Sequence, residues 1–128
     1  MSLNMRNSTF SVNSINYIYH VLVNPQYYVG GLSFKYSFLE FFDILAIGDA
    51  IKFNKTLVKL DLSKNAFKSV SLKFFLEAIQ DNSALAHLDL SGNHLDNEFA
   101  FDLAFLLEKN QSLHTVDIST NPIEPEGA

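Results

Sequence analysis

The sequence predicts an α/β solenoid in which one strand–helix unit is stacked several times. A single segment recurs three times: residues 57–67 read LVKLDLSKNAF, residues 85–95 read LAHLDLSGNHL and residues 113–123 read LHTVDISTNPI. The copies follow one another at a constant 28-residue spacing. A repeat of this length is one supersecondary unit that buries its apolar side only against its neighbours. We therefore expect a right-handed solenoid with a short parallel sheet on the concave face and helices on the convex face.

Each repeat combines a strand signal with a helix signal. Leu60, Asp61 and Leu62 alternate apolar and polar residues, which indicates a short strand. Apolar residues at helical spacing follow the asparagine of each copy. They predict two inward helix faces, which are Leu72, Phe75, Leu76 and Ile79 and, one repeat later, Ala100, Leu103, Ala104 and Leu107. Asn82 and Asn110 are expected to end these helices in a left-handed turn.

The same register continues toward the N-terminus in weaker form. Residues 29–55 fit a degenerate first repeat, with Ser37 at the position of the asparagine. Residues 14–24 predict a capping helix that covers this repeat, because the outer side of a terminal unit meets water. Residues 1–28 are therefore expected to form an N-terminal segment with a capping helix.

Residues 29–128 are expected to form the repeat domain, with repeats that start near residues 29, 57, 85 and 113. The last repeat is predicted to be truncated. Residues 121–128, NPIEPEGA, have the composition of a turn that enters a helix, and no helical sequence follows them. We expect either that the chain is a piece of a longer stack or that another molecule completes it.

The repeat resembles the leucine-rich repeat, and its length resembles the ribonuclease-inhibitor-like subclass. The family motif LxxLxLxxNxL is matched by three sets of residues: Leu57, Leu60, Leu62, Asn65 and Phe67; Leu85, Leu88, Leu90, Asn93 and Leu95; and Leu113, Val116, Ile118, Asn121 and Ile123. Gly127 and Ala128 stand where that subclass often has Gly-Ala at the start of its helix. The resemblance implies that the chain binds other proteins on its concave sheet or along the repeat edges.

A narrower resemblance concerns residues 50–67, AIKFNKTLVKLDLSKNAF, and residues 76–88. This stretch is similar to the C-terminal repeat domain of tropomodulins, which implies binding to actin filament ends. Ran GTPase-activating proteins and NOD-like receptor sensors share the same repeat.

Charge and composition argue against several classes of partner. The net charge is −5, and Arg6 is the single arginine. No basic patch is present, so we expect no nucleic-acid partner. No apolar run approaches the roughly 20 residues of a membrane span, so we expect no membrane partner. The chain has no cysteine, which excludes disulfides and thiolate metal sites and favours a cytoplasmic location. We expect no cofactor and no metal.

The concave face is the predicted binding surface. Side chains in register on neighbouring parallel strands should form two rows that contact a partner: Lys59, His87 and Thr115, and Asp61, Asp89 and Asp117. At about 5 Å, two carboxylates repel by about 0.8 kcal/mol in water and about 3 kcal/mol at an effective dielectric of 20. Lys59 and His87 lie two residues before Asp61 and Asp89 on the same face, and we expect them to relieve part of this repulsion. A bound cation or a lysine or arginine of a partner could relieve the rest. The alternative is an ordinary consensus in which the aspartates stay solvated.

Two other polar sets have structural explanations. Asn65, Asn93 and Asn121 predict a buried ladder that pairs with backbone groups of the turns. His87, Asp89 and Ser91 supply the residue types of a hydrolase triad. However, alternation along one strand should separate their side chains by roughly 7 Å, too far for a relay between nucleophile and base. We therefore predict no catalytic residues and no enzymatic activity.

The last helix predicts an apolar edge. Four residues lie beyond its inward stripe and are candidates for an edge interface: Phe99, Phe101, Phe105 and Leu106. They are expected to stay bare at the C-terminal edge of the stack. This edge is either the interior of a solenoid cut open or a surface for self-association.

The sequence thus favours a non-catalytic protein-binding module that holds a protein partner on its concave face. An alternative is a structural fragment of a larger repeat sensor or scaffold, whose open edge packs on further repeats or self-associates. A tropomodulin-like actin regulator is a third, narrower possibility. Nothing in the sequence identifies the partner.

Overall fold

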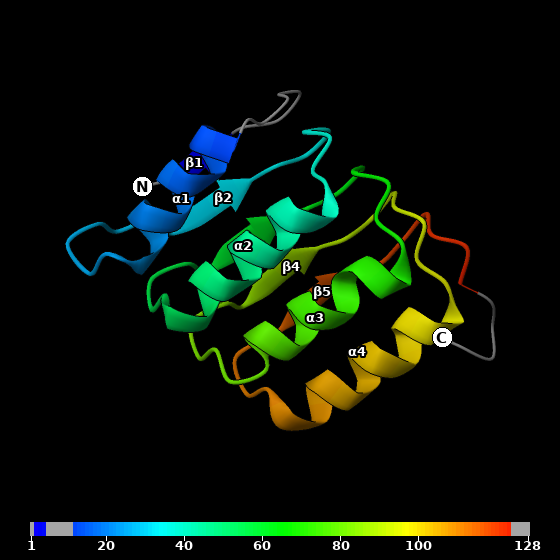
Figure 1. Cartoon of the computed structure of the whole chain (residues 1–128). Coiled ribbons are helices and arrows are strands. Elements are labelled where there is room, and N and C mark those ends of the chain that lie inside the picture. Colours follow the sequence, from blue (N-terminus) through cyan, green and yellow to red (C-terminus); the bar gives the residue numbers. More distant parts are fainter. Residues whose placement is uncertain (1, 5–11, 124–128) are drawn as a thin grey trace.

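The computed structural model describes residues 2–4 and 12–123, and these residues form the expected α/β solenoid (Figure 1). In chain order the elements are β1 (Ser2–Asn4), α1 (Val12–Val23), β2 (Gly31–Ser33), α2 (Phe41–Phe53), β3 (Lys59–Asp61), α3 (Ser69–Ile79), β4 (His87–Asp89), α4 (Asn97–Lys109) and β5 (Thr115–Asp117). Within this part of the chain the strands form one sheet in the order β1-β2-β3-β4-β5. The helices lie side by side in a second layer on one face of the sheet.

The predicted register between neighbouring strands is confirmed. Every strand pair is parallel, and Leu60 of β3 stands opposite Leu88 of β4, which stands opposite Val116 of β5. These central residues point toward the helices, and Leu60 and Leu88 are buried. Because side chains alternate along a strand, the residues on either side of them point to the concave face.

The N-terminal segment contains a strand that the sequence did not predict. Ser2 of β1 pairs with Gly31 of β2, so this segment extends the sheet as well as the helix layer. The helix α1 covers residues 12–23, close to the expected 14–24. The hydroxyl of Tyr19 on α1 donates to Oδ2 of Asp49 on α2 at 2.9 Å. The domain division at residue 28 stays a prediction.

The core lies between the sheet and the helices. The inward face predicted for α3 is buried at all four positions, from Leu72 to Ile79. The consensus leucines of two repeats are also buried: Leu57, Leu60, Leu62, Leu85, Leu88 and Leu90. Each repeat therefore covers the apolar groups of its neighbour, as the stacking principle requires.

The inward face predicted for α4 is confirmed at Ala100 and Leu103 and is wrong at Ala104 and Leu107. The buried stripe of α4 consists of Phe99, Ala100, Leu103 and Leu106, whereas Ala104 and Leu107 are exposed. Leu107 occupies the position that Ile79 has one repeat earlier. Ile79 is fully buried because α4 packs beside it, and Leu107 is 44% exposed on the flank that faces away from α3. Phe99 and Leu106 turn inward because the core and α3 lie on their side of the helix.

One backbone position adopts the left-handed conformation in all four repeats, and Phe38 and Ala66 adopt it as well in the first two. Tyr36, Lys64, Gly92 and Thr120 occupy equivalent positions of successive repeats and have φ angles of 58°, 57°, 68° and 53°. This conformation costs a residue with a Cβ atom roughly 1–2 kcal/mol. Gly92 meets the requirement of the turn without that cost.

Asn82 and Asn110 do not end their helices in a left-handed turn. Asn110 has the extended angles φ −80° and ψ 133°, and Asn82 is not among the described residues with positive φ. Instead, the buried amide group of Asn82 donates to the carbonyl oxygens of Ile51 at 2.8 Å and Asn54 at 3.1 Å. Its Oδ1 accepts the N–H of Leu85 at 2.7 Å. The asparagine ties the end of one helix to the next strand, and these bonds replace the predicted cap.

Candidate functional site

The concave face forms one hollow of about 650 Å³. Its lining includes all six residues that the sequence predicts as partner contacts: Lys59, Asp61, His87, Asp89, Thr115 and Asp117. Gly31 and Ser33 of β2 extend the two rows toward the N-terminal side. Parallel strands in register place these side chains on one surface, so the structure brings the predicted residues together. Their role in binding stays a prediction.

The three aspartates share one hydrogen-bonding geometry. In each case Oδ1 accepts the backbone N–H and the hydroxyl of the serine two residues later. For Asp89 these distances are 2.9 Å to the nitrogen of Ser91 and 2.7 Å to its oxygen. The hydroxyl of Ser63 donates to Asp61 at 2.6 Å, and Ser63 is buried. The serines therefore lie in the turns that follow the strands, and their hydroxyls hold the carboxylates in place.

The hydrogen bonds from Ser119 lower the pKa of Asp117. The hydroxyl of Ser119 has the larger effect, and its backbone N–H adds to it. Both donors stabilise the charged form of the carboxyl group. At neutral pH the surface therefore presents a carboxylate at the end of the aspartate row.

The row of Lys59, His87 and Thr115 has a different pattern of contacts. Nδ1 of His87 lies 2.6 Å from Oγ1 of Thr115 on the next strand. Within residues 2–4 and 12–123, the ammonium group of Lys59 forms no hydrogen bond or ion pair with Asp61. Lys59 is exposed and stays solvated. The expected relief of the aspartate repulsion through a Lys59–Asp61 pair is therefore wrong for the isolated chain.

The geometry of the predicted triad needs one correction. Asp89 and Ser91 are in hydrogen-bond contact and not separated as strand alternation predicts, because β4 ends at Asp89 and Ser91 belongs to the turn. The hydroxyl of Ser91 donates to the carboxylate, while His87 contacts Thr115. A nucleophilic serine needs its hydroxyl next to a base such as histidine. This arrangement gives Ser91 no such base.

The asparagine ladder is built from buried side chains that bind backbone groups of two repeats. Oδ1 of Asn93 accepts the N–H groups of Asn65 and Phe67 at 2.9 and 3.1 Å. Its amide donates to the carbonyl oxygens of Leu62, Leu90 and Ser91. Asn65 makes the same contacts one repeat earlier, and its Oδ1 accepts the N–H of Ser37. Asn121 repeats the pattern with four bonds and is only half-buried.

The candidate edge interface divides into two groups. Phe99 and Leu106 are buried in the core, so the expectation that they stay bare is wrong. Phe101 and Phe105 are 62% and 57% exposed. On the flank of α4 that faces away from α3, Ala104 and Leu107 are exposed. In and around β5 the apolar side chains are half-buried: Leu113, Val116, Ile118 and Ile123. Gly127 and Ala128 lie outside the described residues.

Sequence reasoning missed the outer face of the helix layer. Phe42 and Phe74 are 78% and 51% exposed on α2 and α3, on the side away from the sheet. A helical projection of residues 41–53 and 69–79 places both opposite the buried stripe, so the signal was present. The second asparagine ladder, Asn54, Asn82 and Asn110, was also visible as a 28-residue spacing three positions before the first leucine of each repeat.

The described residues offer no group of three histidine, aspartate or glutamate side chains that could hold a metal ion. None of the described helices has both the length and the apolar character that crossing a membrane requires.

Comparison with known families supports the repeat pattern. A family model described as "Leucine Rich repeat" matches residues 53–76, 81–100 and 109–128. Together these matches cover half of the 128 residues. A search of curated proteins found no match.

Proposed function

Because the chain belongs to the leucine-rich repeat family, we propose that it is a non-catalytic module that binds a protein partner on its concave strand face. The observation that carries this proposal is the row of Asp61, Asp89 and Asp117 along one hollow. Their carboxylates are already fixed by hydrogen bonds from the neighbouring serines. A partner that binds them loses little additional side-chain entropy, which favours affinity.

The chemistry of the row favours a cationic segment of the partner. Within the described part of the chain, Oδ2 of Asp89 and Oδ2 of Asp117 accept no hydrogen bond. Oδ2 of Asp61 is 3.5 Å from the hydroxyl of Ser33. Lysine or arginine side chains of a partner can donate to these oxygens, and their charge offsets the repulsion within the row.

The test uses a variant that removes the negative charge of the three aspartates but keeps the side-chain oxygen that accepts the hydrogen bonds from the serines. Asp61→Asn, Asp89→Asn and Asp117→Asn together keep an oxygen at Oδ1, so the turns should stay intact. Partners captured from native extract are quantified for the wild type, the triple variant and the control Asp81→Asn, which lies in an exposed loop outside the hollow. We expect the triple variant alone to lose the partner. Equal capture by the triple variant would contradict the proposal.

A second candidate function rests on the apolar C-terminal side of the stack. Leu107 is exposed where its counterpart Ile79 is buried, and Val116 is half-buried where Leu88 is buried. This surface fits a scaffold or sensor in which further repeats, or a second copy, cover β5 and α4. A consensus repeat of matching length fused after Ala128 should then raise the free energy of unfolding. An unchanged value, together with a strict monomer in sedimentation, would exclude this candidate.

The subclass and the tropomodulin-like role rest on resemblance alone, and the cytoplasmic location rests on the absence of cysteine. A ribonuclease-inhibitor-like subclass, a tropomodulin-like role and a cytoplasmic location are kept as predictions. Actin assembly kinetics that the protein leaves unchanged would exclude the tropomodulin-like role.

A further inference from the structure

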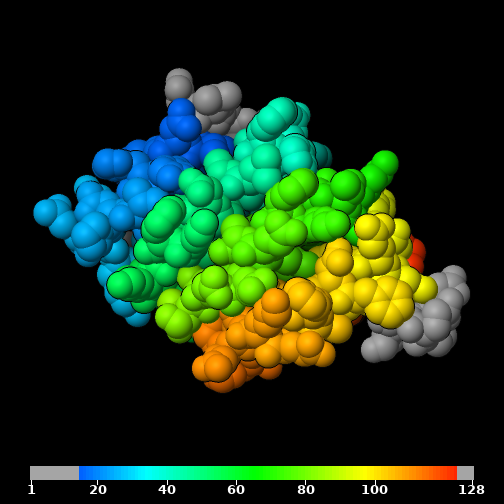
Figure 2. All heavy atoms as spheres, turned by 60° about the horizontal axis from the view of Figure 1, so that its bottom comes forward, coloured from blue at the N-terminus to red at the C-terminus, as the bar shows by residue number. Residues whose placement is uncertain are grey.

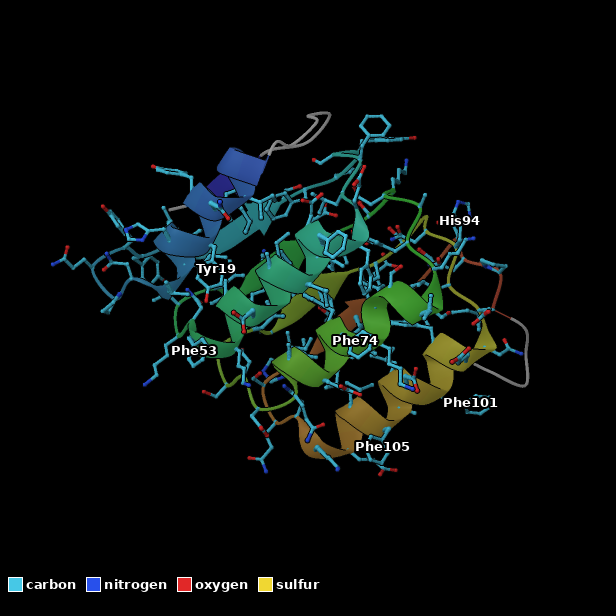
Figure 3. All side chains as sticks on the ribbon, in the orientation of Figure 1. Tyr19, Phe53, Phe74, His94, Phe101 and Phe105 are labelled. Carbon is cyan, nitrogen blue, oxygen red and sulfur yellow. The ribbon has the colours of Figure 1, made fainter. Side chains whose placement is uncertain are left out.

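The convex face carries a group of exposed apolar side chains that the concave binding function does not use. They lie on three successive helices: Phe41, Phe42 and Phe53 on α2, Val70 and Phe74 on α3, and Phe101 and Phe105 on α4. Each is at least 38% exposed. Figure 3 shows Phe53, Phe74, Phe101 and Phe105 on the helix layer. Clustered apolar groups of this kind on a soluble protein mark an interaction surface.

Three of these rings form one cluster across two helices. The ring of Phe41 contacts those of Phe42 and Phe74 edge to face, with centroids 5.8 and 6.4 Å apart. The exposed rings of α2 and α3 therefore make a joint surface. Such aromatic clusters are typical anchor sites for a partner.

Two grooves flank α3 next to these rings. One, between α2 and α3, is lined by Leu45, Asp49, Lys52, Phe74, Glu77 and Ala78. The other, between α3 and α4, has a volume of about 260 Å³ and is lined by Lys73, Leu76, Glu77, Gln80, Asp102, Phe105 and Leu106. Figure 2 shows these helices as neighbouring ridges of the surface. A further helix can pack its side chains into grooves of this kind between neighbouring helices.

The charges of the two grooves favour a cationic occupant. Their linings hold three carboxylates, Asp49, Glu77 and Asp102, and two ammonium groups. In residues 2–4 and 12–123, no hydrogen bond or ion pair engages the carboxylates of Glu77 and Asp102. A second copy that docks through the same face would bring the same three carboxylates against these grooves.

One contact within the patch shows how a cation fits it. Nζ of Lys109 lies 4.3 Å from the centroid of the Phe105 ring. An ammonium or guanidinium group is attracted to the face of an aromatic ring at this distance. A lysine or arginine of a partner can occupy equivalent positions over Phe74 and Phe101.

We propose that the convex face is a second docking surface and that its occupant is an amphipathic helix of another protein. Apolar side chains at positions i, i+3, i+4 and i+7 of that helix contact Phe74 and Phe105. Its lysines and arginines pair with Glu77 and Asp102. This site lies on the opposite side of the helix layer from the aspartate row, so a partner there leaves the concave face open.

The test uses two labelled helical peptides of about 18 residues, roughly five turns. Both carry one leucine stripe; the remaining positions are lysine in the first and glutamate in the second. We expect the wild type to bind the lysine peptide at least about tenfold more tightly, with an affinity that falls as salt increases. Replacement of both Phe74→Ser and Phe105→Ser should weaken binding by about tenfold or more. Both side chains are exposed, so circular dichroism should show an unchanged fold.

The control is the triple aspartate-to-asparagine variant of the concave face, which should bind the lysine peptide like the wild type. Loss of binding in that control, or equal binding of both peptides, would overturn the proposal. A dimer in sedimentation that disappears in the double phenylalanine variant would assign the face to a second copy instead. Phenylalanine-dependent association with phosphatidylcholine vesicles would assign it to a lipid surface.

Discussion

The backbone N–H of Asn65 donates to Oδ1 of Asn93, the equivalent residue of the next repeat, at 2.9 Å. Both side chains are buried. Each asparagine of the ladder thus satisfies backbone groups of the repeat before it as well as its own. Buried backbone groups cost free energy when they lack partners. The ladder therefore couples the repeats in the same register that aligns the concave aspartates.

Replacement of Asn93→Ala should lower the free energy of unfolding by about 1–3 kcal/mol, because it leaves buried backbone groups without partners. Asn121→Ala is the matched control, since Asn121 makes similar bonds but is half-buried and its groups can bind water. The loss of unfolding free energy in Asn121→Ala should therefore be smaller than in Asn93→Ala. Urea unfolding measures both values. Equal losses would show that burial of the ladder does not determine its contribution.

The left-handed turn predicts opposite effects at two equivalent positions. Gly92→Ala should destabilise the fold by about 1–2 kcal/mol. A Cβ atom there would lie 2.8 Å from Cγ of Lys64, which adds to the strain. Lys64→Gly should be neutral or stabilising by up to about 1 kcal/mol, because φ is 57° at this residue. Thermal unfolding measures the stability of both variants. A Gly92→Ala variant that is more stable than the wild type would contradict the left-handed conformation of residue 92.

A pH dependence follows from the start of α4. The hydroxyl of Ser69 donates to Asp96 at 2.6 Å, and this bond is the main reason why the pKa of Asp96 is lowered. A carboxyl group with a lowered folded-state pKa contributes stability above its unfolded pKa and loses it as the pH falls. Ser69→Ala should therefore destabilise the protein more at pH 7 than at acidic pH.

The measurement is the unfolding temperature of both proteins between neutral pH and pH 3. The difference between wild type and Ser69→Ala should shrink as the pH falls. A difference that is constant with pH would mean that Ser69 acts through packing and not through the carboxylate of Asp96.

The open side of α4 gives a matched pair of substitutions. Ile79→Ala removes a fully buried side chain and should cost about 2–5 kcal/mol. Leu107→Ala removes the equivalent side chain one repeat later, which is 44% exposed, and should cost well under half as much. Chemical unfolding at low protein concentration measures both. A similar cost for Leu107 would indicate that another molecule covers this edge in solution.

The regular parts of the fold could be predicted because residues 28 positions apart in the sequence stand opposite each other on neighbouring strands. This spacing identified which residues of β3, β4 and β5 stand opposite one another, and so placed Asp89 between Asp61 and Asp117. It did not predict β1, because Leu3, which pairs with Leu32, lies one position off the 28-residue register, and an alternation over three residues is too short to mark a strand.

The errors at α4 and in the turns have a common physical origin. The predicted inward stripe of α4 has apolar residues on both of its flanks, and periodicity alone does not say which flank packs against α3. Phe99 and Leu106 lie on the flank that does. The contact between Ser91 and Asp89 was missed because a strand of three residues ends before the alternation rule would predict. Tertiary contacts settle both points.

The most direct test of the account is an NMR measurement of the strand register. We expect interstrand nuclear Overhauser effects between backbone protons of Leu60 and Leu88, and of Leu88 and Val116. This register places the three aspartates on one concave wall. Effects between residues shifted by one position along the strands would mean that alternate aspartates point toward the core side of the sheet. Such a result would contradict both the shared hollow and the function proposed for it.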